Sequence, residues 1–230
     1  MSILPIIGII VISYLIGSVP FGFIVVRIIN GKDIRTIASG RTGGTNAMRA
    51  AGLGAGIATA ILDGLKGAVV VWLARWYYPG LIWVQVAAPL MAMMGHNYSI
   101  YLLERRADDK RLRLGGGAGG APCVGGAVGL WPPSLLIILP LAAGIWYGIG
   151  YASVTTMSIA LIATILFAVR AYLGLSPWIY VLYGAIAELI VLWALRPNIK
   201  RLISGTERLH GWRARKKAGA VTINKNQAMQ

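Results

Sequence analysis

The segment of residues 39–49, SGRTGGTNAMR, combines residue types that bind phosphate. Glycine permits turns in which backbone N–H groups converge on an anion, and arginine presents a planar fork of donors to phosphate oxygens. A helix that begins directly after the loop would add the positive end of its dipole. By composition alone, this segment is either a phosphate site or a flexible polar loop beside anionic lipid.

A second glycine-rich stretch, residues 115–120 (GGGAGG), follows the basic residues Lys110, Arg111 and Arg113. Two basic, glycine-rich loops on one face of a membrane suggest two anionic groups that are handled together. Glycine runs also permit close helix packing, so this stretch is open to both interpretations.

A few ionisable side chains interrupt otherwise apolar runs. Asp63 and Lys66 are three residues apart and share one helix face, as a structural ion pair or as ligand contacts. Glu188 is similar but has no obvious local partner. His96 follows Gly95 at the end of an apolar run, where a hydrogen-bonded structural role is favoured. No second histidine clusters with it, so we expect no metal site.

The composition indicates which kind of protein positions these residues. The chain is 57% hydrophobic and 13% charged, with a mean hydropathy of +0.69. Soluble domains are about 45–50% apolar and about 25% charged, so an ordinary soluble domain and a disordered chain are both excluded. A single cysteine excludes an intrachain disulfide. We therefore predict an all-α integral membrane protein.

Six apolar runs are long enough to suggest membrane crossing, since about 20 residues span the hydrocarbon core. The fourth run is too long for one untilted helix, and its Trp131-Pro132-Pro133-Ser134 segment would break a helix. A break there predicts seven transmembrane helices. The runs are Ile3–Val26, Ala50–Trp76, Leu81–Leu103, Gly119–Ile149, Tyr151–Val169 and Trp178–Ala194.

The distribution of basic residues predicts the orientation. Residues 27–49 hold five Lys or Arg, residues 104–114 hold five more, and the chain from Arg196 holds nine. Seven spans place all three segments on one side, so the positive-inside rule predicts an external N-terminus and a cytoplasmic C-terminus. We expect residues 1–209 to form the membrane domain and residues 210–230 a basic, flexible tail. The basic segments do not form a module in which aromatic residues alternate with basic ones, so we expect no nucleic acid partner.

Several motifs resemble those of one family, in the same order along nearly the whole chain. Residues 39–49 resemble the SGNxGATNxxR signature of PlsY, the membrane glycerol-3-phosphate acyltransferase that uses acyl phosphate. DGLKG at 63–67 resembles the family's DxxKG, and GHNY at 95–98 its GHxF. YAS at 151–153 resembles YVS, and NIKRLISGTE at 198–207 resembles NIxRLxxGxE.

The resemblance implies acyl transfer from acyl phosphate to the sn-1 hydroxyl of glycerol 3-phosphate, at the cytoplasmic side of the inner membrane. It implies no metal or cofactor, and leaves the oligomeric state open. Ser39, Arg49 and Asn198 would be catalytic, whereas Asp63 and Glu207 would be structural. The implied substrate-binding residues are Gly40, Gly43, Thr45, Asn46, Lys66, His96, Gly116, Gly117, Gly119, Ser153 and Arg201.

Two departures from the family keep an alternative open. The family's KGGKG signature corresponds to residues 115–119, where Gly115 and Ala118 replace both lysines. The closing HRxN motif begins here with Leu195. A cation from residues 110–113 could replace the lost lysines. The alternative is a diverged, weak or inactive member that binds a phosphorylated ligand or transports it.

Overall fold

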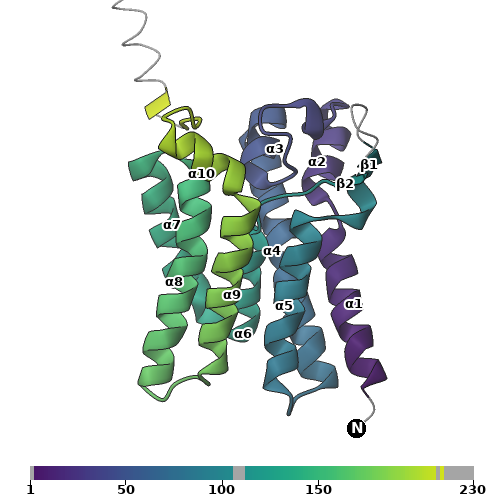
Figure 1. Ribbon diagram of the computed structural model, residues 1–230, viewed down its shortest axis with the longest axis vertical. Coiled ribbons are helices and arrows are strands. Elements are labelled where there is room, and N and C mark those ends of the chain that lie inside the picture. The colour runs from purple at the N-terminus through teal and green to yellow at the C-terminus, as the bar shows by residue number, and fades with distance from the viewer. Residues whose placement is uncertain (1–2, 106–111, 211–212, 215–230) are drawn as a thin grey trace, which may run out of the picture.

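The computed structural model describes residues 3–105, 112–210 and 213–214, and this part of the chain is almost entirely helical (Figure 1). In chain order the elements are α1 (Leu4–Ser18), α2 (Phe21–Asn30), η1 (Ile34–Thr36), α3 (Gly44–Ala51), α4 (Leu53–Tyr77), α5 (Ile82–Asn97), η2 (Ile100–Leu102), β1 (Leu103–Arg105), β2 (Leu112–Leu114), α6 (Gly120–Leu130), η3 (Pro132–Ser134), α7 (Leu135–Ile149), α8 (Ala152–Tyr172), α9 (Ile179–Ala194) and α10 (Arg196–Ile203).

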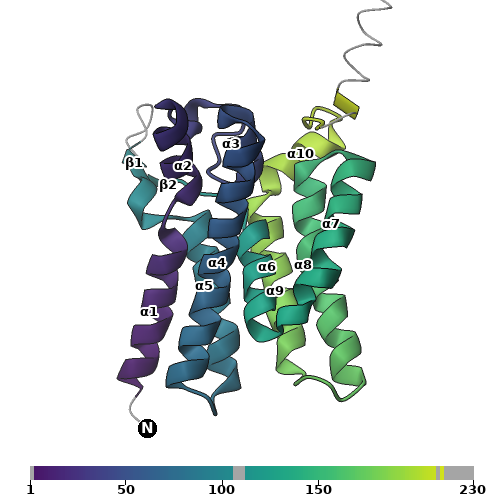
Figure 2. The same ribbon diagram turned by 180° about the vertical axis from the view of Figure 1, so that it is seen from behind.

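The long helices lie side by side, and the short elements gather at one end of this bundle. Figures 1 and 2 show α2, α3, α10 and the antiparallel hairpin β1–β2 at that end, with the N-terminus at the opposite end. The described parts of the three basic segments therefore meet at one end of the molecule. We call it the basic end.

Membrane-spanning capacity is clear for part of the bundle. Among the described residues, four helical stretches are long and apolar enough to cross a membrane, and α9 with α10, bent by 68°, would be a fifth. The four stretches are Leu4–Asn30, Leu53–Tyr77, Pro132–Ile149 and Ala152–Tyr172. Helices α5 and α6, with 16 and 11 residues, are shorter.

Prolines divide two of the apolar runs. The predicted break inside Gly119–Ile149 is confirmed, because α6 ends at Leu130 and the η3 turn separates it from α7. The first run, expected to be one uninterrupted helix, also divides: α1 ends at Ser18, and α2 begins after Pro20. Proline lacks the N–H that would continue the hydrogen-bond ladder, which explains both interruptions.

Glycines allow α4 and α6 to pack closely. A Cβ atom on Gly125 would lie 1.8 Å from the carbonyl oxygen of Gly64, and one on Gly67 would lie 2.4 Å from that of Pro122. Small residues let helix backbones approach, as is common in membrane bundles. This contact places the N-terminal end of α6 beside α4, where the candidate site lies.

A hydrophobic core joins α5, α6, α8 and α9. Met93, Cys123, Phe167 and Tyr183 are fully buried in it. The Tyr183 hydroxyl donates a hydrogen bond of 2.6 Å to the Cys123 carbonyl oxygen. Because a buried hydroxyl needs a partner, this bond lets a large polar aromatic ring fill the centre of the bundle.

Candidate active site

A cavity of about 850 Å³ lies between residues of α3, α4, α6, α7, α8 and α10. Its polar lining comes from the loops and helix ends of the basic end, and its apolar lining comes from α4, α6 and α7. The polar residues that line it are Ser39, Arg41, Thr45, Asn46, Arg49, Asp63, His96, Ser153, Thr155, Thr156, Asn198, Arg201, Glu207, Arg208 and His210.

One buried amide organises the first loop, residues 31–43. The Asn46 side-chain nitrogen lies 3.1 Å from the carbonyl oxygen of Ile34, 3.0 Å from that of Ile37 and 2.8 Å from that of Arg41. Its two hydrogens are shared among these carbonyls, which curls the loop around the start of α3. Ser39 and Thr45 then both face the cavity.

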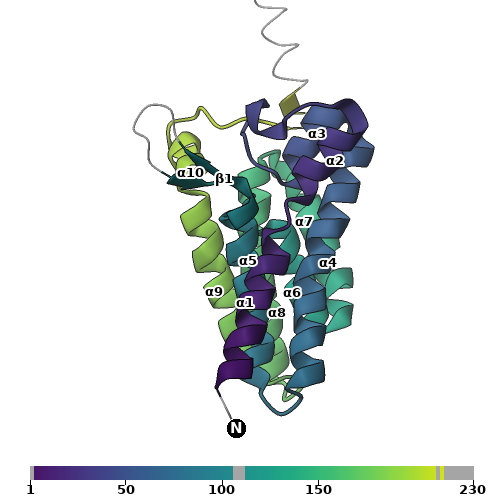
Figure 3. The same ribbon diagram turned by 90° about the vertical axis from the view of Figure 1, so that its right-hand side faces the viewer.

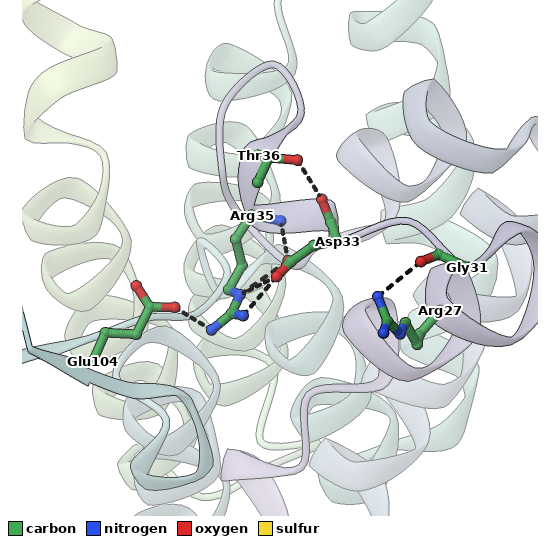
Figure 4. A network of polar contacts seen from close by, with 6 residues as sticks. All are labelled: Arg27, Gly31, Asp33, Arg35, Thr36 and Glu104. Carbon is green, nitrogen blue, oxygen red and sulfur yellow. Dashed lines mark hydrogen bonds and ion pairs between the residues drawn. The ribbon is translucent and has the colours of Figure 1, made fainter.

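An ion-pair network holds the same loop against the hairpin (Figure 4). Arg35 Nε donates to Asp33 Oδ1 at 2.9 Å, and Arg35 Nη1 is paired with Glu104 of β1. The bound guanidinium of Arg35 lowers the pKa of Asp33. Thr36 Oγ1 also donates to the Asp33 carbonyl oxygen. These contacts stabilise the loop from the side away from the cavity, because none of the four residues lines it.

Three helices begin at the cavity wall. The residues at their N-termini that line it are Gly43 and Gly44 for α3, Gly119 and Gly120 for α6, and Ala152 and Ser153 for α8. The first N–H groups of a helix have no partner within the helix and carry its positive dipole end. Ser153 is 2% exposed, and its buried hydroxyl has no hydrogen-bond partner in the described structure. This wall therefore favours an anion.

Arg49 adds a guanidinium from the last turn of α3. Its Nη2 lies 2.6 Å from Nε2 of His210, a residue that is buried against the ring of Trp146. Partial burial, reinforced by the charge of Arg208, lowers the pKa of Arg49. No described carboxylate forms an ion pair with Arg49. Its positive charge is therefore available to a ligand.

The segment after α10 crosses the basic end (Figure 3), and its residues Glu207, Arg208 and His210 line the cavity. Glu207 accepts hydrogen bonds of 2.8 Å from Asn198 Nδ2 and from Arg201 Nε, which fold this segment back on α10. Further along, the His210 amide donates to the carbonyl oxygen of Gly150. Asn198 Oδ1 is buried and has no hydrogen-bond partner among the described residues.

Asp63, Lys66 and His96 form a buried cluster under the cavity. Lys66 Nζ lies 2.8 Å from Asp63 Oδ1, 2.9 Å from His96 Nδ1 and 3.0 Å from the carbonyl oxygen of Val19. Asp63 and His96 line the cavity, whereas Lys66 does not. Of the two interpretations left open by the sequence, this geometry favours a structural ion pair for Lys66.

The glycine-rich loop, residues 115–119, packs directly on the end of α5. A Cβ atom on Gly117 would lie 1.9 Å from His96 Nε2, and one on Gly116 would lie 2.3 Å from the His96 carbonyl oxygen. The Gly117 amide donates to that same oxygen at 2.8 Å. Glycine is required here because the loop backbone lies against the imidazole ring.

The structure brings most of the predicted site residues together. Those that line the cavity are Ser39, Gly43, Thr45, Asn46, Arg49, Asp63, His96, Gly119, Ser153, Asn198, Arg201 and Glu207. The predicted residues that do not line it are Gly40, Lys66, Gly116 and Gly117. Gly40 instead provides a turn with a φ of +68°.

Sequence reasoning included Arg41 in the candidate phosphate segment without assigning it a role of its own, and it assigned no site role to Arg208 or His210. All three line the cavity. The position of Arg41 in the first loop, between Gly40 and Gly43, was a sequence signal that could have identified it. No such sequence signal marks His210, because it lies in a polar stretch without apolar periodicity. It was assigned to the tail of residues 210–230, of which only residues 210, 213 and 214 are described.

The two departures from the family motif, Ala118 and Leu195, both line the cavity. Of the basic residues expected to compensate, Arg113 is exposed on β2, and Lys110 and Arg111 lie outside the described residues. Within the described ranges, no group of three or more His, Cys, Asp or Glu side chains is arranged to hold a metal ion.

Solved structures share this fold. The chain matches a crystal structure of PlsY, an integral membrane glycerol 3-phosphate acyltransferase, in its glycerol 3-phosphate form, with a TM-score of 0.77 and 26% identity over 90% of this chain and 96% of that one. The lysophosphatidic acid form of that protein matches with a TM-score of 0.75 and 25% identity.

Sequence comparison agrees. A glycerol-3-phosphate acyltransferase of Rubrobacter xylanophilus is 37% identical over 205 residues, which cover 89% of this chain and 95% of the relative. One from Thermus thermophilus is 36% identical over 204 residues, 88% of this chain and 94% of the relative. The family described as glycerol-3-phosphate acyltransferase matches residues 7–205. With these matches over nearly its whole length, the chain belongs to the glycerol-3-phosphate acyltransferase family.

Proposed function

We propose that this protein transfers a fatty acyl group from acyl phosphate to the sn-1 hydroxyl of glycerol 3-phosphate, giving lysophosphatidic acid and phosphate for phospholipid synthesis. The observation that carries the proposal is a single cavity with a cationic polar end and an apolar groove. Relatives named for glycerol-3-phosphate acyl transfer, and structures of one in its substrate and product forms, support it.

The polar end suits two phosphate groups. Arg49 and the N-terminal end of α3 would hold one phosphate, with Ser39 nearby and His210 positioning the guanidinium. The N-terminal ends of α6 and α8 offer a second group of N–H donors on the same cavity. Charge-assisted bonds from such fixed donors are the strong class of hydrogen bond.

We place Asn198 and Ser153 against the reacting groups, because both line the cavity and each has a buried oxygen without a hydrogen-bond partner among the described residues. Thr45, Gly43, Gly119 and Arg201 complete the polar lining. We assign supporting roles to Asp63, Lys66, Asn46 and Glu207, whose side chains are bonded to protein atoms. His96, Gly40, Gly116 and Gly117 shape the loops that hold the donors.

The apolar part of the cavity would take the acyl chain. Its lining faces the side of the bundle built by α4, α6 and α7, and therefore allows a chain to enter from lipid. An apolar groove with polar groups at one end matches an amphiphilic donor. The lining residues are Leu53, Ile57, Ile61, Leu65, Ala68, Trp72, Val124, Val128, Leu135, Leu139 and Ile159.

The chemistry needs no covalent enzyme intermediate, because the donor is already activated. The hydroxyl oxygen of glycerol 3-phosphate attacks the acyl carbonyl carbon and forms the ester bond. The bond between that carbon and the phosphate oxygen breaks. The hydroxyl proton ends on the released phosphate, which leaves as HPO₄²⁻. The protein holds the two anions close together and stabilises the charge of the leaving phosphate.

We further propose seven transmembrane segments, formed by α1 with α2, then α4, α5, α6, α7, α8 and α9. The basic end would face the cytoplasm, and the N-terminus the outside, because lysine and arginine accumulate on the cytoplasmic side. The active site would then open at the cytoplasmic face of the inner membrane. Residues 1–209 would form the membrane domain and residues 210–230 a basic tail, whose first residue, His210, is anchored in the site by its contact with Arg49.

The test is turnover by the purified protein in detergent or nanodiscs. Incubation with palmitoyl phosphate and glycerol 3-phosphate should release lysophosphatidic acid and phosphate in equal amounts. Palmitoyl-CoA and palmitoyl acyl carrier protein serve as comparison donors and should give no product. No product from acyl phosphate, together with retained binding of glycerol 3-phosphate, would favour a binding or transport protein instead.

A further inference from the structure

Arg41 lies where the first loop meets two other parts of the cavity wall. Its Nη1 donates a 2.6 Å hydrogen bond to the carbonyl oxygen of Gly117 in the glycine-rich loop. Its Nη2 donates to the carbonyl oxygen of Ala194, the last residue of α9. A cation is favoured at the C-terminal end of a helix, which explains why the guanidinium settles there.

The charge of Arg41 has no counterion in the described structure. Asp33 and Glu104 are paired with Arg35, and Glu207 is bonded to Arg201 and Asn198. Burial, the largest influence, lowers the pKa of Arg41 below its ordinary value. Two carbonyl contacts use only two of the five N–H donors of a guanidinium. A partly buried cation with free donors is costly unless an anion binds it.

The surroundings of Arg41 indicate what kind of anion would bind. The glycine-rich loop has no charged side chain, although it leads into the N-terminal end of α6 at the cavity wall. That helix end stands at the top of the apolar groove, since Val124 and Val128 of α6 line the groove below it. An acyl chain in the groove would therefore carry its phosphate at the level of the glycine-rich loop.

We propose that the Arg41 guanidinium binds the phosphate of the acyl donor and stabilises it as it leaves. Arg41 thereby supplies, from the first loop, the positive charge that the glycine-rich loop lacks. Arg49, which is held by His210, serves the phosphate of glycerol 3-phosphate. The inference rests on the proposed function, and it divides the two phosphate groups between two arginines of one loop and the helix that follows it.

The first test is a kinetic comparison of Arg41→Ala, Arg41→Lys and Arg75→Ala. Arg75 is the matched control, because its guanidinium also bonds a helix-end carbonyl oxygen, that of Leu130, and neither of these two residues lines the cavity. Arg41→Ala should lower kcat/KM for acyl phosphate by about 100-fold, the usual effect of losing one fixed donor to a developing anion. Arg41→Lys should lose less, and Arg75→Ala should change it by less than about threefold.

The KM values separate the two phosphates. The KM of Arg41→Ala for glycerol 3-phosphate should stay within about threefold of the wild-type value, because Arg41 is not assigned to binding that substrate. A rise confined to glycerol 3-phosphate would overturn the assignment to the donor. An Arg41→Ala variant with wild-type kinetics for both substrates would overturn it as well.

A rescue variant distinguishes a charge from a structural support. Ala118 lines the cavity and follows Gly117, whose carbonyl oxygen Arg41 contacts, so Arg41→Ala combined with Ala118→Lys returns a cation to the loop that Arg41 reaches. The kcat/KM of the double variant should be at least about tenfold higher than that of Arg41→Ala alone. Recovery of folding without recovery of rate would mean that Arg41 only supports the carbonyl groups of Gly117 and Ala194.

Binding of inorganic phosphate gives a readout that does not depend on turnover. Phosphate should raise the thermal unfolding temperature of the wild-type protein and of Arg75→Ala, and should raise that of Arg41→Ala by clearly less, because only the Arg49 site remains in that variant. A wild-type protein that binds phosphate in this way yet forms no lysophosphatidic acid would refute the proposed function and leave the anion site standing. The absence of any phosphate-dependent shift in the wild type would overturn the site.

Discussion

His210 and Arg49 are in contact across the candidate site although they are 161 positions apart in the chain. Nε2 of the imidazole lies 2.6 Å from Nη2 of the guanidinium, and the imidazole ring stacks on Trp146. Because a guanidinium can only donate, the imidazole must accept through an unprotonated nitrogen. The contact therefore requires neutral His210.

The contact predicts a pH dependence of stability. Burial and the charge of Arg49 lower the pKa of His210 from 6.5 to about 4 in the folded protein. Between these values the unfolded chain binds more protons, so the stability present above pH 6.5 is lost as the pH falls toward 4. In thermal unfolding scans, His210→Gln should lose less of its unfolding temperature between pH 7 and pH 4.5 than the wild type. Equal losses in the two proteins would contradict the assigned contact.

Arg49 should matter for activity and little for folding. We expect Arg49→Ala to lower kcat/KM for glycerol 3-phosphate by about 100-fold or more, because a fixed charged donor to phosphate is lost. Arg49→Lys should have a kcat/KM between those of the wild type and Arg49→Ala, since lysine keeps the charge and loses the planar fork. Arg170→Ala is the control, because Arg170 lies in the last turn of α8, at the end of that helix opposite to the cavity wall. Unchanged turnover in a folded Arg49→Ala protein would rule out the phosphate contact.

The buried pair of Asp63 and Lys66 should couple in stability. Lys66→Met removes the lysine partner of the buried Asp63 carboxylate and leaves only His96 Nδ1 beside it, at 3.5 Å from Oδ1. Breaking a buried ion pair in this way typically costs about 3–5 kcal/mol. The double variant Asp63→Asn, Lys66→Met removes both charges, and we expect it to unfold at a higher temperature than Lys66→Met alone. Tryptophan fluorescence during heating measures this. Additive effects of the two substitutions would show that the pair is not coupled.

Gly117 should tolerate no side chain. A Cβ atom there would overlap the His96 ring, and relieving such overpacking typically costs about 1–3 kcal/mol. We expect Gly117→Ala to lower both the unfolding temperature and the rate of acyl transfer. Gly144→Ala in α7 is the matched control, because no atom of the described residues that could clash lies within 4 Å of the added methyl group. Similar behaviour of the two variants would place the loop further from His96 than the structure has it.

Local patterns in the sequence were sufficient for much of the architecture. Long apolar runs must become helices in lipid, because every backbone polar group needs a partner there. The proline pair at 132–133 marks the end of α6 for the same local reason, whereas the interruptions at Pro20 and between α3 and α4 were missed. The first loop was also recognisable, since Ser39, Thr45 and Arg49 lie within one short segment.

Only the tertiary structure decided which groups complete the site. Arg41 contacts carbonyl groups 76 and 153 positions away, and His210 reaches Arg49 from beyond α10. Lys66 proved to be engaged by His96 from another helix, which left it outside the cavity lining. Such contacts depend on how distant helices pack, and packing is set by long-range shape and charge that no local residue pattern contains.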